Sequence, residues 1–181
     1  MKVWKMWRIN QKYDDLIPVE EYSVEEMQSY DGRNHKEWWI PKKVKRMQPD
    51  NKRLLGDLSS YLSEPVFSEN ALKKLWSRIK DDVEVLPLTY DEGNFSLINV
   101  TTVLEAIDYE KAKFERFKSS GRIMCFDKFA FREEVIKTHC IFKIIDAPKS
   151  YVFVTDEFVN TVKKNRLKGF SFELVWDSEA E

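Results

Sequence analysis

Apolar and polar positions between residues 65 and 88 follow a strand–helix–strand pattern. Residues 65–67 are extended and apolar, and Ser68 can cap a helix because its hydroxyl accepts a hydrogen bond from a free N–H of the first turn. Alternation over residues 83–87 predicts the second strand. The helix between the strands has one apolar stripe, formed by Leu72, Leu75, Trp76 and Ile79.

The same pattern returns in residues 151–176. An apolar strand leads to Thr155, the predicted cap, and two acids follow where the helix dipole favours negative charge. Gly169 is predicted to terminate the helix, and residues 170–177 alternate as a half-buried strand. Either the two units are equivalent elements packed on one sheet, or they are two ordinary strand–helix–strand pieces. The apolar face of the second helix consists of Phe158, Val159 and Val162.

Hairpins and one further helix are predicted between the two units. Residues 83–89 and 95–100 flank a turn-forming sequence, which predicts a hairpin, and residues 139–154 are expected to form another. A strand or hairpin is expected over residues 123–131. Residues 101–118 carry three apolar residues at helical spacing, which predicts a helix.

Residues 1–60 show a weaker pattern. A short helix capped by Ser23 is predicted at 23–30, a strand at 37–40, and an exposed connection at 41–57.

These elements together predict an α+β fold with a mixed, mostly antiparallel sheet and two or three packed helices. The N-terminal third is expected to be less regular. We expect residues 1–181 to form a single domain, in which residues 1–60 pack as an irregular segment on an α+β core of residues 61–181.

Composition places the chain among globular proteins. Of its 181 residues, 43% are apolar, which is well above the disordered class. No run of 18 apolar residues predicts a membrane span, and the N-terminus has no apolar signal region, so we expect a cytoplasmic protein without membrane association. Cys125 and Cys140 are expected to be reduced, buried and inert.

A search for catalytic chemistry finds no motif. The chain has two histidines and five scattered glycines, and neither a nucleophile elbow nor a phosphate-binding loop is present. His139 and Cys140 are adjacent, so in a strand their side chains point to opposite faces. We therefore expect no catalytic residues, metal or cofactor. An enzyme with an uncatalogued carboxylate site remains an alternative function.

Charge is unevenly distributed along a chain whose net charge is −1. Residues 14–31 contain seven acids and no lysine or arginine, whereas residues 33–53 contain eight bases and two acids. The basic stretch, with Trp38 and Trp39, could be a nucleic-acid-binding module. The favoured interpretation is a solvated loop with two core tryptophans, because the neighbouring acids repel phosphate.

Several segments in a fixed order resemble a family of bacterial immunity proteins of polymorphic-toxin systems. That family is typified by a myxobacterial protein and was formerly catalogued only as a domain of unknown function. This chain departs from the family pattern at Ala112, where a serine is usual after the lysine. The segments are YDDLIPVEEY (13–22), GDLSSYLSEPVFSENALKKL (56–75), VEVLPL (83–88), NVTTVLEAIDYEKA (99–112), IFKI (141–144) and VFVTDEFVNTVKKNRLKGFSFELVW (152–176).

The resemblance implies a non-catalytic protein that binds and neutralises a cognate toxin by covering its surface. Such a protein needs a rigid scaffold and a charged or aromatic surface, and charge complementarity accelerates its association. Because many such toxins have basic clefts, we expect the acidic stretch to contact the toxin, and we leave the oligomeric state open. The candidate contact residues are Asp14, Asp15, Glu20, Glu21, Tyr22, Glu25, Glu26 and Tyr30.

Overall fold

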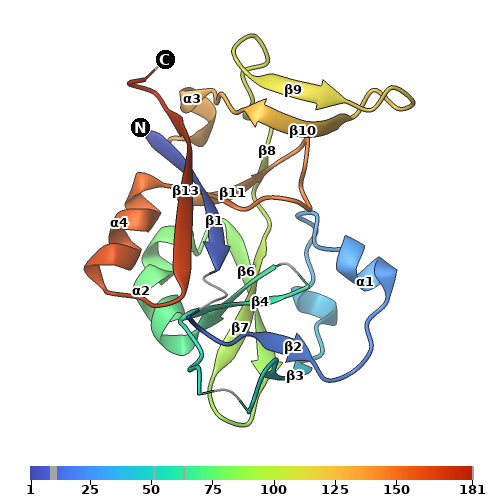
Figure 1. Cartoon of the computed structure of the whole chain (residues 1–181), viewed down its shortest axis with the longest axis vertical. Coiled ribbons are helices and arrows are strands. Elements are labelled where there is room, and N and C mark those ends of the chain that lie inside the picture. The colour runs from blue at the N-terminus through green and yellow to red at the C-terminus, as the bar shows by residue number, and fades with distance from the viewer. Residues whose placement is uncertain (9–11, 51, 63, 181) are drawn as a thin grey trace.

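The computed structural model describes residues 1–8, 12–50, 52–62 and 64–180 (Figure 1). Its described part is an α+β fold, as the sequence predicts, with strands in two larger sheets and one separate hairpin. The five-stranded sheet has the order β13 (Phe170–Asp177), β1 (Lys2–Arg8), β12 (Phe153–Thr155), β11 (Ile141–Ile144) and β8 (Val103–Leu104). The six-stranded sheet has the order β2 (Leu16–Pro18), β3 (Lys42–Arg46), β6 (Val83–Thr89), β7 (Phe95–Val100), β5 (Glu64–Ser68) and β4 (Leu58–Tyr61).

The remaining elements are short apart from two helices. The separate hairpin extends from the body at the top of Figure 1. In each larger sheet one neighbouring pair is parallel, β8 with β11 and β3 with β6, and the other pairs are antiparallel. The elements are β9 (Lys113–Arg116), β10 (Ile123–Lys128), α1 (Val24–Gln28), the 3₁₀ helix η1 (Lys36–Trp38), α2 (Glu69–Ile79), α3 (Glu133–Ile136) and α4 (Asp156–Lys164).

The two strand–helix–strand units of the sequence are β5–α2–β6 and β12–α4–β13. In the first unit β7 lies between the two strands and is antiparallel to both. In the second unit β1 has the same position between β12 and β13. The units are therefore equivalent in topology, but the prediction that they share one sheet is wrong. Each belongs to its own sheet, and the two helices contact each other.

Both helices contribute to one apolar core that joins the units. Leu75 of α2 and Phe158 of α4 are fully buried in it, together with Met6 of β1. The predicted stripe of α2 is partly wrong, because Trp76 is 44% exposed and Leu72 is only partly buried. The buried side chains on α2 are Ala71, Leu75 and Ile79, one every four residues.

The ends of the helices confirm some predicted caps and correct others. The Ser68 hydroxyl accepts a hydrogen bond from the Ala71 N–H at 3.1 Å, as predicted. Thr155 occupies the N-cap position of α4, but its side chain makes no capping hydrogen bond. Arg166, with φ of 53°, follows the C-cap of α4, and the turn is closed by backbone bonds of Arg166 and Leu167 to the last turn. Gly169 does not end the helix, because it lies at the start of β13.

The N-terminal third is more regular than the sequence predicts. β1 is an internal strand of the five-stranded sheet, between β12 and β13, and β2, β3 and β4 join the other sheet. The predicted strand at 37–40 is wrong, since Lys36–Trp38 forms the 3₁₀ helix η1. The predicted connection at 41–57 contains β3, whose alternating lysines are exposed while Val44 is buried. These strands form because they pair with strands that are distant in the sequence, which the local pattern does not show.

The predicted helix at 101–118 is also wrong. Val103 and Leu104 pair in parallel with β11, and Ile107 forms an isolated bridge with Phe131. The Asp108 carbonyl accepts N–H groups of a turn, and β9 then pairs with β10. Tertiary pairing therefore overrides the helical spacing here. The hairpins β6–β7 and β11–β12 are confirmed.

Candidate functional site

The structure separates the eight predicted contact residues into three groups. Asp14, Asp15 and Tyr30 are 6%, 8% and 2% exposed, so these residues are buried within the fold. Glu26 is partly buried. The residues of the set that are exposed to solvent are Glu20, Glu21, Tyr22 and Glu25.

The beginning of the acidic segment, which we define as residues 14–31, is held by buried carboxylates. Asp14 Oδ2 accepts a hydrogen bond from Arg46 Nε at 2.8 Å, within an ion pair to β3. Asp15 Oδ1 accepts the Ser60 N–H at 2.9 Å and the Ser59 hydroxyl, both in β4. Because these acids satisfy buried donors, they stabilise the fold and are not displayed to a partner.

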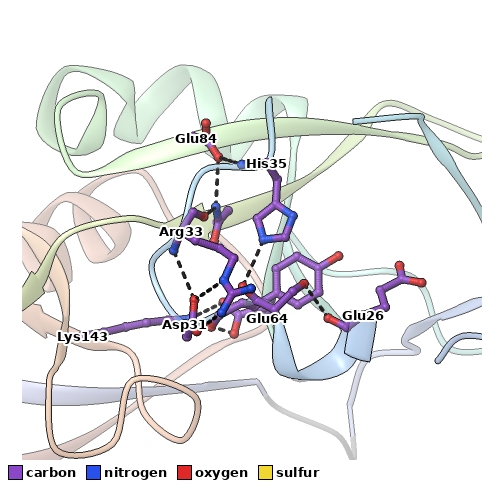
Figure 2. Close-up of polar contacts among 10 residues, drawn as sticks. Glu26, Asp31, Arg33, His35, Glu64, Glu84 and Lys143 are labelled. Atoms are coloured by element: carbon purple, nitrogen blue, oxygen red, sulfur yellow. Dashed lines mark hydrogen bonds and ion pairs between the residues drawn. The ribbon is translucent and has the colours of Figure 1, made fainter. Parts of the chain in front are cut away.

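The end of the acidic segment rests on a buried ion pair (Figure 2). Lys143 Nζ donates to both carboxylate oxygens of Glu64 at 2.9 Å and to the Tyr30 carbonyl at 2.7 Å. The side chains of Lys143 and Glu64 are 1% and 4% exposed. Burial raises the pKa of Glu64, and the attraction of Lys143 opposes this change. All three ammonium protons are used, so the lysine holds the backbone in place.

A second set of contacts fixes the chain that follows Tyr30. The His35 ring stacks on Tyr30 with centroids 4.9 Å apart, and its Nε2 lies 3.1 Å from the Ser29 carbonyl oxygen. The His35 N–H donates to Glu84 Oε2 at 2.7 Å. Asn99 Nδ2 donates to the same carboxylate oxygen at 3.0 Å. These contacts attach the segment to β6 and β7.

Asp31 and Arg33 form a pair at the turn between these two sets of contacts (Figure 2). Arg33 Nε and one terminal nitrogen donate to the two Asp31 carboxylate oxygens at 2.9 and 2.7 Å. These hydrogen bonds hold the pKa of Asp31 below its ordinary value. The pair is exposed on the arginine side, so it orders the local turn and adds little stability.

Between these attachments, residues 19–28 form an exposed loop and helix. Ser23 caps α1 by accepting the Glu26 N–H at 3.0 Å, and no residue of α1 is buried. Glu26 is held by the Tyr61 hydroxyl at 3.1 Å and by Lys42 at 3.3 Å. The large apolar side chains exposed here are Val19 (43%), Tyr22 (50%), Val24 (58%) and Met27 (43%).

We name residues 19–28 the exposed α1 segment. Its apolar side chains alternate with Glu20, Glu21 and Glu25, all exposed. Both ends of the segment are fixed to the sheets, so the chain presents an apolar and acidic surface with a defined shape. The exposure of Val24 and Met27 could not be predicted from the sequence, because their i, i+3 spacing is also typical of a buried helix face. Only the tertiary structure shows that nothing in the described chain covers them.

The basic stretch of residues 33–53 does not bury both of its tryptophans. Trp38 is 82% exposed, and Ile40 is 75% exposed. Trp39 is partly buried and donates its indole N–H to the Pro87 carbonyl at 2.8 Å. The expectation of two core tryptophans is therefore wrong for Trp38, which belongs to the short 3₁₀ helix.

The adjacent titratable side chains of His139 and Cys140 each have a partner within the fold. His139 Nδ1 lies 2.6 Å from Asp82 Oδ1, whereas the Cys140 thiol lies 3.3 Å from Glu157 Oε2. Burial raises the pKa of the Cys140 thiol to about 12, and the hydrogen bond to Glu157 adds to this effect. The two neighbours thus face different partners. Among the described residues, no group of three or more His, Cys, Asp or Glu side chains could hold a metal ion.

Comparison with protein families gives a match to part of the chain. Residues 89–177 match the model of the immunity protein family described as Imm11. No curated protein matches the chain. In the described part of the chain, no helix is long and apolar enough to cross a membrane. Three of the segments that carry the sequence resemblance lie within the matched range, including the closing strand with Trp176. Residues 89–177, about half of the chain, therefore match the Imm11 immunity protein family, which agrees with the family that its motifs resemble.

Proposed function

We propose that this chain protects its cell by binding a cognate toxin through the exposed α1 segment and covering the surface on which the toxin acts. The observation that carries this proposal is an exposed apolar and acidic segment attached at both ends to the scaffold of an immunity family. The protection is non-catalytic, because covering a surface requires only affinity and shape.

The attachment of the segment bears directly on affinity. Ordering a flexible loop on binding costs about 0.5–1.5 kcal/mol for each immobilised side chain, so a segment that is already ordered loses less. Tyr22 is half-exposed and belongs to a residue type enriched among binding hot spots. The glutamates around it would attract a basic toxin cleft and accelerate association.

Co-expression with the toxin domain encoded next to this gene tests the proposal, with cell survival as the readout. The double variant Glu20→Lys, Glu25→Lys should lose protection and bind the purified toxin more slowly at low salt. Asp81→Lys with Asp91→Lys is the matched control, since it makes the same charge change at exposed acids outside the segment. Full survival of cells that carry the first variant would exclude this surface.

Two further statements belong to this proposal. The protein acts in the cytoplasm. Cell fractionation should recover it in the cytoplasmic fraction, and recovery in another fraction would contradict this statement. The chain acts as a single domain, which is supported by Met6 and Leu58 lying in the same core as Leu75 and Phe158. A single coincident unfolding transition by fluorescence and circular dichroism is expected, and two separate transitions would contradict it.

A second candidate function is binding of nucleic acid by residues 33–53, favoured by the exposure of Trp38. An aromatic ring at 82% exposure among lysines is suited to stacking on a base. Filter binding of single-stranded RNA and DNA at two salt concentrations, with Trp38→Ala as the comparison, separates this candidate from the first. If the wild type and the Trp38→Ala variant retain equal amounts of nucleic acid on the filter, this candidate is eliminated.

A further inference from the structure

A cleft lies almost entirely within the family-matched residues 89–177, and its lining includes no residue of the exposed α1 segment. It has a volume of about 790 Å³ and is bordered by residues 105–111, the start of α3 and the end of β13. Figure 1 shows α3 beside the C-terminal end of β13. The apolar floor is formed by Ile107, Phe131 and Trp176, which are 1%, 3% and 6% exposed.

The rim of this cleft is acidic. Five carboxylates and two basic groups line it, which gives a formal net charge of −3. Lys111 Nζ lies 3.7 Å from Asp108 Oδ2, so one carboxylate is partly balanced within the chain. The excess negative charge is carried by the exposed glutamates Glu105, Glu110, Glu133 and Glu134.

One donor in the cleft has no acceptor within the described chain. A terminal nitrogen of Arg132 donates to the Glu105 carbonyl, but the Arg132 Nε is buried without a hydrogen-bond partner. Because this nitrogen is closed to solvent, it is not a contact for a ligand in the cleft.

Two of the motifs that carry the family resemblance meet at this cleft. Asp108 and Lys111 come from the segment at 99–112, and Trp176 closes the segment at 152–176. The exposed α1 segment, in contrast, lies outside the matched residues 89–177. The cleft is therefore a feature of the family-matched half that the proposed contact surface does not use.

We infer that this cleft binds a basic stretch of polypeptide. The aliphatic part of an arginine or lysine side chain lies on the apolar floor, and its charged end meets the rim glutamates. Charge complementarity selects this occupant over an acidic one. The identification of the occupant as part of the toxin rests on the proposed function, whereas the chemistry of the cleft does not.

A tetra-arginine peptide with blocked ends is the probe, titrated into the full chain and followed by NMR and calorimetry. The expected result is saturable shifts of the Trp176 indole signal and of amides in residues 105–111. The double variant Glu110→Gln, Glu133→Gln should bind about tenfold more weakly, which corresponds to about 1.4 kcal/mol for the loss of two exposed ion pairs. Asp81→Asn with Asp91→Asn removes the same charge at exposed acids outside both surfaces and should bind like the wild type.

Shifts confined to residues 19–28, or equal affinity of the Glu110 and Glu133 variant and the wild type, would overturn the inference. A tetra-glutamate peptide should give no shifts at the cleft, and binding of that peptide there would also overturn it. The peptide titration is independent of the survival assay. If the survival assay excludes the α1 segment but the peptide binds the cleft, the inference about the cleft stands. If the survival assay supports the α1 segment but the peptide does not bind the cleft, only the inference about the cleft is rejected.

Discussion

Replacing Lys143 by methionine is expected to destabilise the fold strongly. Methionine has a similar length and fills the space, but it leaves the Glu64 carboxylate and the Tyr30 carbonyl without their shared donor. Both side chains of the ion pair are less than 5% exposed. Removing one partner of a buried ion pair costs about 3–5 kcal/mol, out of a total stability of about 5–15 kcal/mol for a protein.

Urea unfolding followed by tryptophan fluorescence measures this cost. With a slope of about 2 kcal/mol per molar urea, the midpoint should fall by about 1.5–2.5 M. Lys149→Met is the matched control, because it makes the same chemical change at an exposed lysine a few residues away, and its free energy of unfolding should stay within about 0.5 kcal/mol of the wild type. Glu64→Leu combined with Lys143→Met should recover much of the stability, since no charge is then left buried.

The destabilisation should also depend on pH in a defined direction. The pKa of Glu64 is already raised by burial, and removing Lys143 removes the attraction that lowers it. In the variant the folded state therefore holds the Glu64 proton to higher pH than the unfolded state, whose pKa is near 4.5. Stability must then fall as pH rises above 4.5, so the variant lies closest to the wild type near pH 4.5 and furthest at pH 7.

The same variant tests the attachment of the acidic segment. Hydrogen exchange of the amides in residues 28–35 should accelerate, because the Tyr30 carbonyl loses its contact with β11. A variant that unfolds within 0.5 kcal/mol of the wild type, with unchanged exchange, would refute the interpretation that Lys143 holds this part of the chain.

Three further predictions concern the scaffold. Leu75→Ala should lower the free energy of unfolding by about 2–5 kcal/mol because Leu75 is fully buried, whereas Trp76→Ala, at a 44% exposed position, should cost much less in the same urea titration. Gly169→Ala should lower the melting temperature more than Gly121→Ala, since both have positive φ but only the new Cβ at Gly169 would lie 2.9 Å from a backbone oxygen; equal shifts would contradict this. Cys140, whose thiol pKa is raised to about 12, should resist alkylation by iodoacetamide at pH 8 until urea unfolds the chain, and rapid alkylation in the native state, detected by mass spectrometry, would show that the thiol is not held as described.

The sequence by itself determined the parts that depend on neighbouring residues. Ser68 and Ser23 cap their helices because a capping hydroxyl needs only the next turn of the same helix. Hairpins such as β6–β7 follow from a turn and its two flanking strands. The two equivalent strand–helix–strand units, the α+β class and the resemblance to an immunity family were all predictable for the same reason.

Tertiary structure alone decided which charged and aromatic residues reach solvent. Asp14 and Asp15 have the same local pattern as Glu20 and Glu21, yet partners in β3 and β4 bury the aspartates and leave the glutamates exposed. The helical spacing at 101–118 likewise yields to strand pairing with β11. Such outcomes depend on residues far apart in sequence, whose contacts exist only after the two sheets have formed. The surface that a toxin could meet is therefore a property of the folded chain.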